Sequence, residues 1–295
     1  MSEQTVLIAG HGQMGHAMET LLAGRTRLSV WRIAPDDLEL PASVGRDAVA
    51  ADFLLICTPT VAHAEILERL GPHLKHAAVL SIAKGLDDAG RCAADILQDY
   101  CGALPWGVLG GPMIANEIIA GKPAFAELGS YDKTLLRRLR GLYPEGGLSI
   151  SGATNPHAVS WCGVLKNIYA PLVGISDELG WGDNARGHIV MTAVREMKAI
   201  VRILTSEDAQ AYGDAGLADF VTTVTSASSH HYALGRRVAR GDYGNLECEG
   251  IHSLQVLRAK GRIDPGTLAL FGLATRLLDQ RPGFPQALHD WLIAG

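Results

Sequence analysis

The chain has 295 residues, enough for two domains, of which 47% are hydrophobic and 19% are charged. This balance excludes a disordered or fibrous protein. With a net charge of −5 it carries no basic excess for nucleic acid or anionic membranes, so we expect neither as a partner.

Five cysteines lie without a Cys-x-x-Cys spacing, so neither a disulfide framework nor a metal site is predicted. The first residues lead into an apolar run without the basic segment of a secretion signal. Lysine, asparagine, proline or glycine interrupts each apolar stretch before it could span a bilayer. We therefore expect a cytoplasmic protein without membrane insertion. Glycine is frequent, at 34 residues, which indicates sharp turns or close backbone approaches.

The first half of the chain alternates short apolar runs with helical patterns. Parallel strands buried on both faces are expected to appear as continuous apolar runs. The strand-like runs are 6–9, 28–31, 53–57, 78–82 and 106–109, and apolar residues at helical spacing cover 13–24, 61–70 and 89–100. We predict an α/β Rossmann domain with a doubly wound, mostly parallel sheet over residues 1–153.

After about residue 150 the strand pattern stops. Helical spacing runs from Asn155 to about Arg202, with interruptions expected at Pro171 and at the turn 180–182. Further helical patterns cover 229–240, 247–260, 265–280 and 285–293. The sequence therefore predicts an all-α domain over residues 154–295, and its apolar positions could support a homodimer.

Gly10, Gly12 and Gly15 form a Gly-x-Gly-x-x-Gly motif between the first predicted strand and the first predicted helix. In that place the first glycine permits a tight turn and the second lets a pyrophosphate approach the backbone. The third lets helix and strand pack closely, and the helix N-terminus offers free N–H groups. We assign these glycines, with Gln13 and Met14, to dinucleotide binding.

Arg32 follows the second predicted strand, where an acidic residue selects NAD and an arginine accommodates the 2′-phosphate of NADP. The first acidic residues after this strand, Asp36 and Asp37, follow Pro35. The pattern favours NADP over NAD, and the alternative is that Arg32 is a solvated surface residue.

Two lysines are candidates for the chemistry. Lys84 stands at the end of the fourth predicted strand, on the sheet edge where α/β proteins bind ligands. Lys166 is the only charged residue between Ala158 and Ser176. Desolvation and a second cation such as Lys84 would lower its pKa towards that of a proton donor and acceptor. Asn167 offers an amide to a substrate oxygen, and the alternative for Lys166 is an ammonium that reaches solvent.

Three further segments have the chemistry of ligand contacts. The turn that contains Gly111 can direct backbone N–H groups at a ligand. Ser229 precedes a helical pattern as an N-cap, and a helix N-terminus beside His230 and His231 suits an anion. Ordinary turns and solvated residues are the alternatives.

In order and spacing these motifs resemble the NAD(P)-dependent glycerol-3-phosphate dehydrogenase family along nearly the whole chain. The resemblance implies hydride transfer between NAD(P)H and dihydroxyacetone phosphate or sn-glycerol 3-phosphate, a reaction of glycerophospholipid metabolism. The segments that carry it are 10–15, 83–85, 110–117, 163–167, 182–185, 216–219 and 249–250.

The resemblance also implies roles for individual residues. Lys166 would donate and remove the proton, Lys84 would hold the substrate, and Asp219 would orient Lys166. The other implied contacts are Gly111 for the substrate and Lys84, Ala115 and Glu249 for the cofactor.

The chain has Ser229-His230-His231 where the family has Ser-Arg-Asn, which grips the substrate phosphate and the cofactor. Three hypotheses follow. The first is a glycerol-3-phosphate dehydrogenase whose phosphate clamp uses Ser229, His230 and Arg236. The second is a reductase of another keto or hydroxy compound, as in ketopantoate reductases. The third is a non-catalytic, dinucleotide-binding redox sensor that responds by domain closure.

Overall fold

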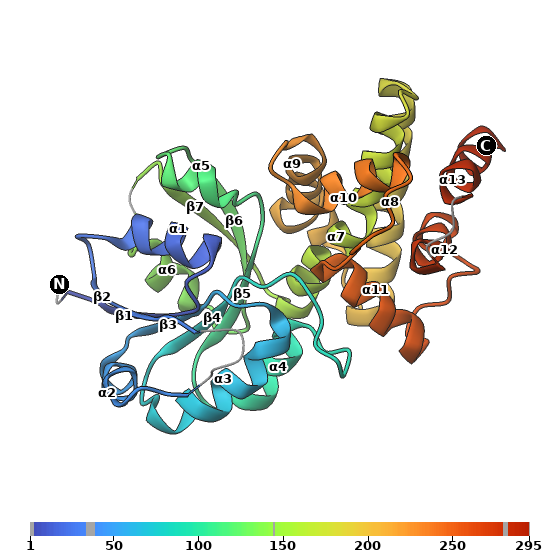
Figure 1. Cartoon of the computed structure of the whole chain (residues 1–295). Helices are drawn as coiled ribbons and strands as arrows, with labels where there is room; N and C mark the ends of the chain where they lie inside the picture. Colours follow the sequence, from blue (N-terminus) through green and yellow to red (C-terminus); the bar gives the residue numbers. More distant parts are fainter. Residues whose placement is uncertain (1–2, 34–38, 144, 280–282, 295) are drawn as a thin grey trace.

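The computed structural model describes residues 3–33, 39–143, 145–279 and 283–294. A seven-stranded sheet flanked by helices is followed by a helical part (Figure 1). The predicted fold class, a Rossmann sheet followed by an all-α region, is confirmed. The strands are β1 (Thr5–Ala9), β2 (Arg27–Trp31), β3 (Phe53–Ile56), β4 (Ala78–Ser81), β5 (Trp106–Gly110), β6 (Ala124–Gly129) and β7 (Leu148–Ala153).

The sheet order is β2-β1-β3-β4-β5-β6-β7, and every pair is parallel except β5 with β6. The chain reverses its direction of travel across the sheet at β1, so the crevice at the carboxyl ends of β1 and β3 is where such folds bind ligands. Strands β6 and β7 were not predicted, because neither is a continuous apolar run: Glu127 interrupts β6, and serines alternate with apolar residues in β7.

Helices cover both faces of the sheet. In Figure 1, α1, α5 and α6 lie on one face and α2, α3 and α4 on the other. The helices of this part are α1 (Gln13–Leu22), α2 (Ala42–Ala50), α3 (His63–Leu70), α4 (Ala93–Tyr100), α5 (Ala115–Ile119) and α6 (Leu135–Arg140).

The helical part is built around α7, which packs against β5 and β6 at its start and is then surrounded by α8, α10 and α11 (Figure 1). The sheet ends at Ala153 and α7 begins at Pro156. The helices are α7 (Pro156–Glu178), α8 (Asp183–Thr205), α9 (Asp219–Thr225), α10 (His230–Ala239), α11 (Glu249–Lys260), α12 (Ala269–Arg276) and α13 (Phe284–Ala294).

The expectation that Pro171 interrupts the helix is wrong, because α7 continues through it to Glu178. A proline has no N–H, so the carbonyl of Asn167, four residues earlier, loses its helical partner. Gly250 of α11 lies directly against that carbonyl: a Cβ built on it would stand 2.3 Å from the Asn167 oxygen. Tight packing from neighbouring helices therefore keeps the helix intact where its local sequence is unfavourable.

Helix α7 is also long and apolar enough to cross a bilayer by length and composition, contrary to the expectation that Lys166, Asn167 and Pro171 rule this out. The 18-residue window that meets this test is wholly buried inside the protein. The central helix of a globular domain has the same length and composition, so the test is weak evidence for a membrane span.

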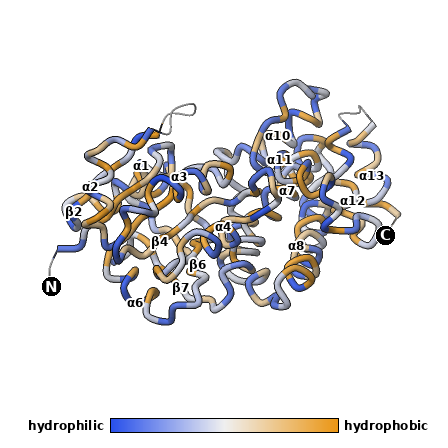
Figure 2. Tube along the Cα trace, turned by 90° about the horizontal axis from the view of Figure 1, so that it is seen from below, coloured by the Kyte–Doolittle hydropathy of each residue, from blue (hydrophilic) through white to orange (hydrophobic). Residues whose placement is uncertain are grey.

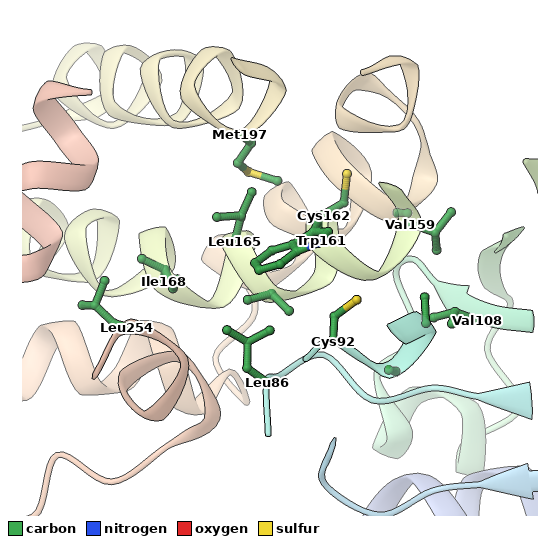
Figure 3. Close-up of a cluster of buried hydrophobic side chains, with 14 of the residues drawn as sticks. Leu86, Cys92, Val108, Val159, Trp161, Cys162, Leu165, Ile168, Met197 and Leu254 are labelled. Atoms are coloured by element: carbon green, nitrogen blue, oxygen red, sulfur yellow. The ribbon is translucent and has the colours of Figure 1, made fainter. Parts of the chain in front are cut away.

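One hydrophobic core joins the sheet to the helical part. Trp161, Cys162 and Leu165 of α7 share a cluster with Val108 of β5 and Met197 of α8 (Figure 3). In Figure 2 hydrophobic positions are frequent in the strands of the sheet and alternate with hydrophilic ones along the helices. The two parts are therefore fixed to each other through α7 by close apolar packing.

Replacing Gly235 by alanine is expected to destabilise the protein by about 1–3 kcal/mol. Helices α7 and α10 cross at glycines: a Cβ on Gly235 would stand 1.9 Å from the Pro171 oxygen, and one on Gly174 would stand 2.2 Å from the Tyr232 oxygen. The helices would have to separate, which opens buried apolar surface. Thermal unfolding should show a lower Tm.

Gly187→Ala is the matched control, because Gly187 is exposed within α8 and a Cβ there meets no atom within 4 Å. We expect that variant to be stabilised, by about 1 kcal/mol or less. Equal Tm values for the two variants would show that the α7–α10 crossing tolerates a methyl group.

Candidate active site

The glycine motif forms the turn between β1 and α1 that dinucleotide binding requires. Gly10 has a φ of +96°, which favours glycine. A Cβ on Gly15 would stand 2.1 Å from the Gly10 oxygen, so this residue holds α1 close to the end of β1. At Gly12 a Cβ would meet nothing within 4 Å, which leaves the backbone before α1 open to a ligand.

Asp219 lies between the two lysines. Its Oδ2 accepts a hydrogen bond of 2.7 Å from Lys84 Nζ, and its Oδ1 accepts one of 3.2 Å from Lys166 Nζ. The side chains are 4% exposed for Asp219, 8% for Lys166 and 16% for Lys84. Lys84 also donates to the Gly111 carbonyl at 3.0 Å. The structure thus brings together four predicted site residues from four segments of the chain.

Burial lowers the pKa of Lys166 to about 8. Loss of hydration disfavours the ammonium, and the positive charge of Lys84 acts in the same direction, whereas Asp219 favours the charged form. Both protonation states of Lys166 are therefore accessible near neutral pH, as a group that donates and removes a proton requires.

Thr223 was not predicted as a site residue. Lys166 Nζ donates to its Oγ1 at 2.6 Å, and that hydroxyl donates to the Asp219 carbonyl at 2.7 Å. Asp219 and Thr223 stand one helical turn apart in α9, so the spacing of four residues is the signal that could have found it. The hydroxyl fixes the position of the Lys166 ammonium.

His63 supports the segment that carries Lys84. It is fully buried, its Nε2 lies 2.7 Å from the Ser81 hydroxyl, and that oxygen accepts the Ala83 N–H. Burial lowers the pKa of His63 to about 4, so the ring is neutral and accepts from the serine. This network holds the turn between β4 and Lys84.

A cavity of about 480 Å³ lies over the lysine cluster. Asn167 donates through Nδ2 to the Lys84 carbonyl, while its buried Oδ1 has no partner within the protein. That oxygen is an acceptor available to a ligand hydroxyl. The predicted site residues that line the cavity are Gln13, Met14, Lys84, Ala115, Lys166, Asn167, Asp219, Ser229, His230, His231 and Glu249.

Glu249, the first residue of α11, also lines a second cavity of about 900 Å³. Burial raises the pKa of Glu249, although the charges of Lys166 and Lys84 oppose this. Its carboxylate lies against Gly85, where a Cβ would stand 3.2 Å from Oε1. Glu249 is the residue that the described linings of the two cavities have in common.

The helix N-terminus at one end of the cavity is capped as predicted, because the Ser229 hydroxyl accepts the N–H of Tyr232. His230 is exposed in the first turn of α10. His231 differs: the Gly250 N–H donates to its Nε2 at 3.2 Å, and burial, with Lys166 close by, lowers its pKa to about 3. His231 is therefore neutral and cannot act as a cationic phosphate ligand at neutral pH.

Two arginines lie apart from the lysine cluster. Arg236 pairs with Glu178 at 2.6 Å and is not among the described residues that line either cavity, so its proposed part in a phosphate clamp is not supported. Arg32 is 63% exposed, 4.0 Å from Glu19 of α1. Asp36 and Asp37 lie outside the described residues.

Two family models match most of the chain. Residues 32–136 match the model of the NAD-dependent glycerol-3-phosphate dehydrogenase N-terminus, and residues 155–261 match that of the C-terminus. A glycerol-3-phosphate dehydrogenase from Deinococcus radiodurans is 31% identical, covering 77% of this chain and 69% of its own. One from Agrobacterium fabrum is 27% identical, covering 82% of each chain.

Solved structures support the same fold. Glycerol-3-phosphate dehydrogenase from Coxiella burnetii superimposes with a TM-score of 0.82 at 24% identity, covering 98% of this chain and 99% of its own. A ketopantoate reductase from Ralstonia eutropha gives 0.53 at 16% identity, covering 93% and 98%. With the family models and the relatives, these findings show that the chain belongs to the NAD-dependent glycerol-3-phosphate dehydrogenase family.

Proposed function

We propose that the protein interconverts dihydroxyacetone phosphate and sn-glycerol 3-phosphate, with NADPH or NADH as hydride carrier. The observation that supports this most strongly is the pair of lysines held by Asp219 at the floor of the cleft. The open backbone at Gly12 and the unpartnered Asn167 Oδ1 fit a dinucleotide and a hydroxylated substrate. Family membership makes this reaction the first hypothesis to test.

The nicotinamide supplies or accepts the hydride, and the protein supplies the proton. During reduction of the ketone, Lys166 donates its proton to the oxygen as negative charge develops there, so no free alkoxide forms. Lys84 holds the substrate by charge and hydrogen bonding, and Asp219 fixes both ammonium groups. In the oxidation direction the neutral Lys166 removes the hydroxyl proton.

For the phosphate we propose Ser229, His230 and the N-terminus of α10. Free N–H groups and the helix dipole favour an anion at this position. The first hypothesis therefore keeps Ser229 and His230 as phosphate ligands and gives up Arg236, which pairs with Glu178. A non-catalytic sensor is disfavoured, because a lysine with a pKa lowered to about 8 next to a second lysine is a costly arrangement without chemistry.

The activity is tested by following NADPH and NADH absorbance with dihydroxyacetone phosphate and a panel of keto acids that includes ketopantoate. We expect turnover of dihydroxyacetone phosphate, with a raised KM in His230→Ala. Faster turnover of an unphosphorylated keto acid would favour the second hypothesis. The ratio of the two cofactors' kcat/KM values tests the preference for NADP that Arg32 predicts.

The reaction should depend on pH in opposite ways in its two directions. We expect kcat for reduction to fall above about pH 8, because Lys166 must be protonated to donate and its pKa is about 8. Oxidation needs the neutral amine, so its kcat should rise through the same pH. Initial rates in both directions between about pH 6 and 10 measure this, and a reduction rate that stays flat would argue against Lys166 as the acid.

We also propose a cytoplasmic location and a homodimer. All five cysteines are free, which suits a reducing compartment. The helical part exposes Ile203 of α8 and Ile293 of α13 at 70% and 69%, which a partner subunit could cover. Sedimentation equilibrium of the protein tests the dimer.

A further inference from the structure

The glycine-rich turn carries a group of side chains that the proposed reaction does not use. His11 lies between Gly10 and Gly12, and His16 and Glu19 follow within α1. His11 Nε2 stands 2.5 Å from Glu19 Oε2, and His16 Nδ1 stands 3.4 Å from the same oxygen. In the described parts of the chain, this is the one group of three such side chains whose ligand atoms all lie within 4.8 Å of one another.

We propose that His11, His16 and Glu19 bind a divalent transition metal ion, for which Zn²⁺ is the best match. Two imidazole nitrogens and one carboxylate are a donor set that Zn²⁺ accepts in proteins, with water at its fourth position. The site lies outside the lysine cluster and does not depend on the identity of the substrate.

The three ligand atoms lie within 4.8 Å of one another, and side-chain rotation must bring them to coordination geometry. Zinc–ligand bonds of about 2.0–2.2 Å place the donors of a tetrahedral ion roughly 3.3 Å apart. His16 and Glu19 already have that separation at 3.4 Å, while His11 and Glu19 must open from 2.5 Å. The side chains are 22%, 53% and 29% exposed for His11, His16 and Glu19, so an ion can enter and the rings can turn.

The groups around Glu19 favour its ionised carboxylate, which is the form that binds a metal ion. Its hydrogen bond with His11 lowers the pKa of the carboxyl, and His16 and Arg32 act in the same direction. Arg32 is the competing cation, 4.0 Å from Oε1, but it is 63% exposed and can extend into solvent when an ion takes its place.

A bound ion would hold the His11 side chain and, with it, the backbone between Gly10 and Gly12. Since the proposed function assigns that turn to the cofactor phosphates, we expect Zn²⁺ to tighten NADPH binding. By linkage, NADPH would then tighten Zn²⁺ binding by the same factor. This consequence rests on the proposed function, whereas the metal site itself does not.

The site is tested by calorimetric titration of the chelator-treated full chain with Zn²⁺ and by visible spectra with Co²⁺. We expect one ion per chain at micromolar concentration, the absorption of tetrahedral Co²⁺, and at least about tenfold weaker binding in His16→Ala and in Glu19→Gln. His76→Ala is the matched control, because His76 is 57% exposed and lies 3.5 Å from Asp52. No binding to the wild type, or equal binding to His16→Ala, would overturn the proposal.

NADPH titrations with and without Zn²⁺ test the link to the turn. We expect Zn²⁺ to lower the Kd of NADPH in the wild type and in His76→Ala, but not in His16→Ala. The same Zn²⁺ effect in all three proteins would overturn the link. Failure of NADPH to bind under either condition would contradict the proposed function and leave the metal titration as an independent result.

Discussion

Lys166→Met is expected to lower kcat for dihydroxyacetone phosphate reduction by about 10²–10⁴-fold, the usual contribution of general acid catalysis. Methionine keeps the length and apolar stem of the side chain but has no proton to give. The Kd of NADPH should change much less than kcat, because the proposed role of Lys166 is to give a proton rather than to bind the dinucleotide. Stopped-flow absorbance measures the rate, and fluorescence titration measures cofactor binding.

The matched control is Lys133→Met, which removes an exposed lysine outside the described lining of both cavities. We expect its kcat to equal that of the wild type. If Lys166→Met retained more than a tenth of wild-type turnover, another group would have to supply the proton.

Asp219→Asn is expected to lower kcat for dihydroxyacetone phosphate reduction at neutral pH by about 100-fold, because two ammonium groups would then face a neutral amide. The carboxylate favours the charged form of Lys166, so its loss lowers the pKa of that lysine further. The pH above which kcat for reduction falls should therefore be lower than in the wild type. Rate profiles of the variant and the wild type measure both effects.

Removing one partner of a buried ion pair is also destabilising, by about 3–5 kcal/mol. Thermal unfolding must therefore show that Asp219→Asn is folded at the assay temperature. Asp99→Asn removes a 52% exposed partner of Arg91 and should alter neither the profile nor the rate. If kcat for reduction fell at the same pH in folded Asp219→Asn as in the wild type, Asp219 would not control the protonation of Lys166.

Several features could be read from the sequence because they depend on residues close together in the chain. The apolar runs of β1, β3 and β4 are buried on both faces, so each shows a continuous hydrophobic pattern. The glycine motif, the N-cap at Ser229 and the position of Lys166 as a lone charge in an apolar stretch are also local signals. Together they indicated the fold and the main candidates for the site.

Tertiary contacts outweighed local preference at three positions. Pro171 leaves α7 intact because α10 and α11 pack against its turn of the helix. His231 looked like a potential cation, but burial and Lys166 keep it neutral. Arg236 looked like a phosphate ligand, but it faces Glu178. None of these partners is adjacent in sequence.

By itself the sequence determined a Rossmann sheet, a helical second part and two lysines suited to proton and anion chemistry. Only the tertiary structure decided that Asp219, 135 residues from Lys84 and 53 from Lys166, would lie between them. It also decided that His11, His16 and Glu19 converge beside the glycine turn. The physical reason is that hydrophobic periodicity fixes which face of an element is buried, whereas the distance between two polar groups depends on how the elements pack.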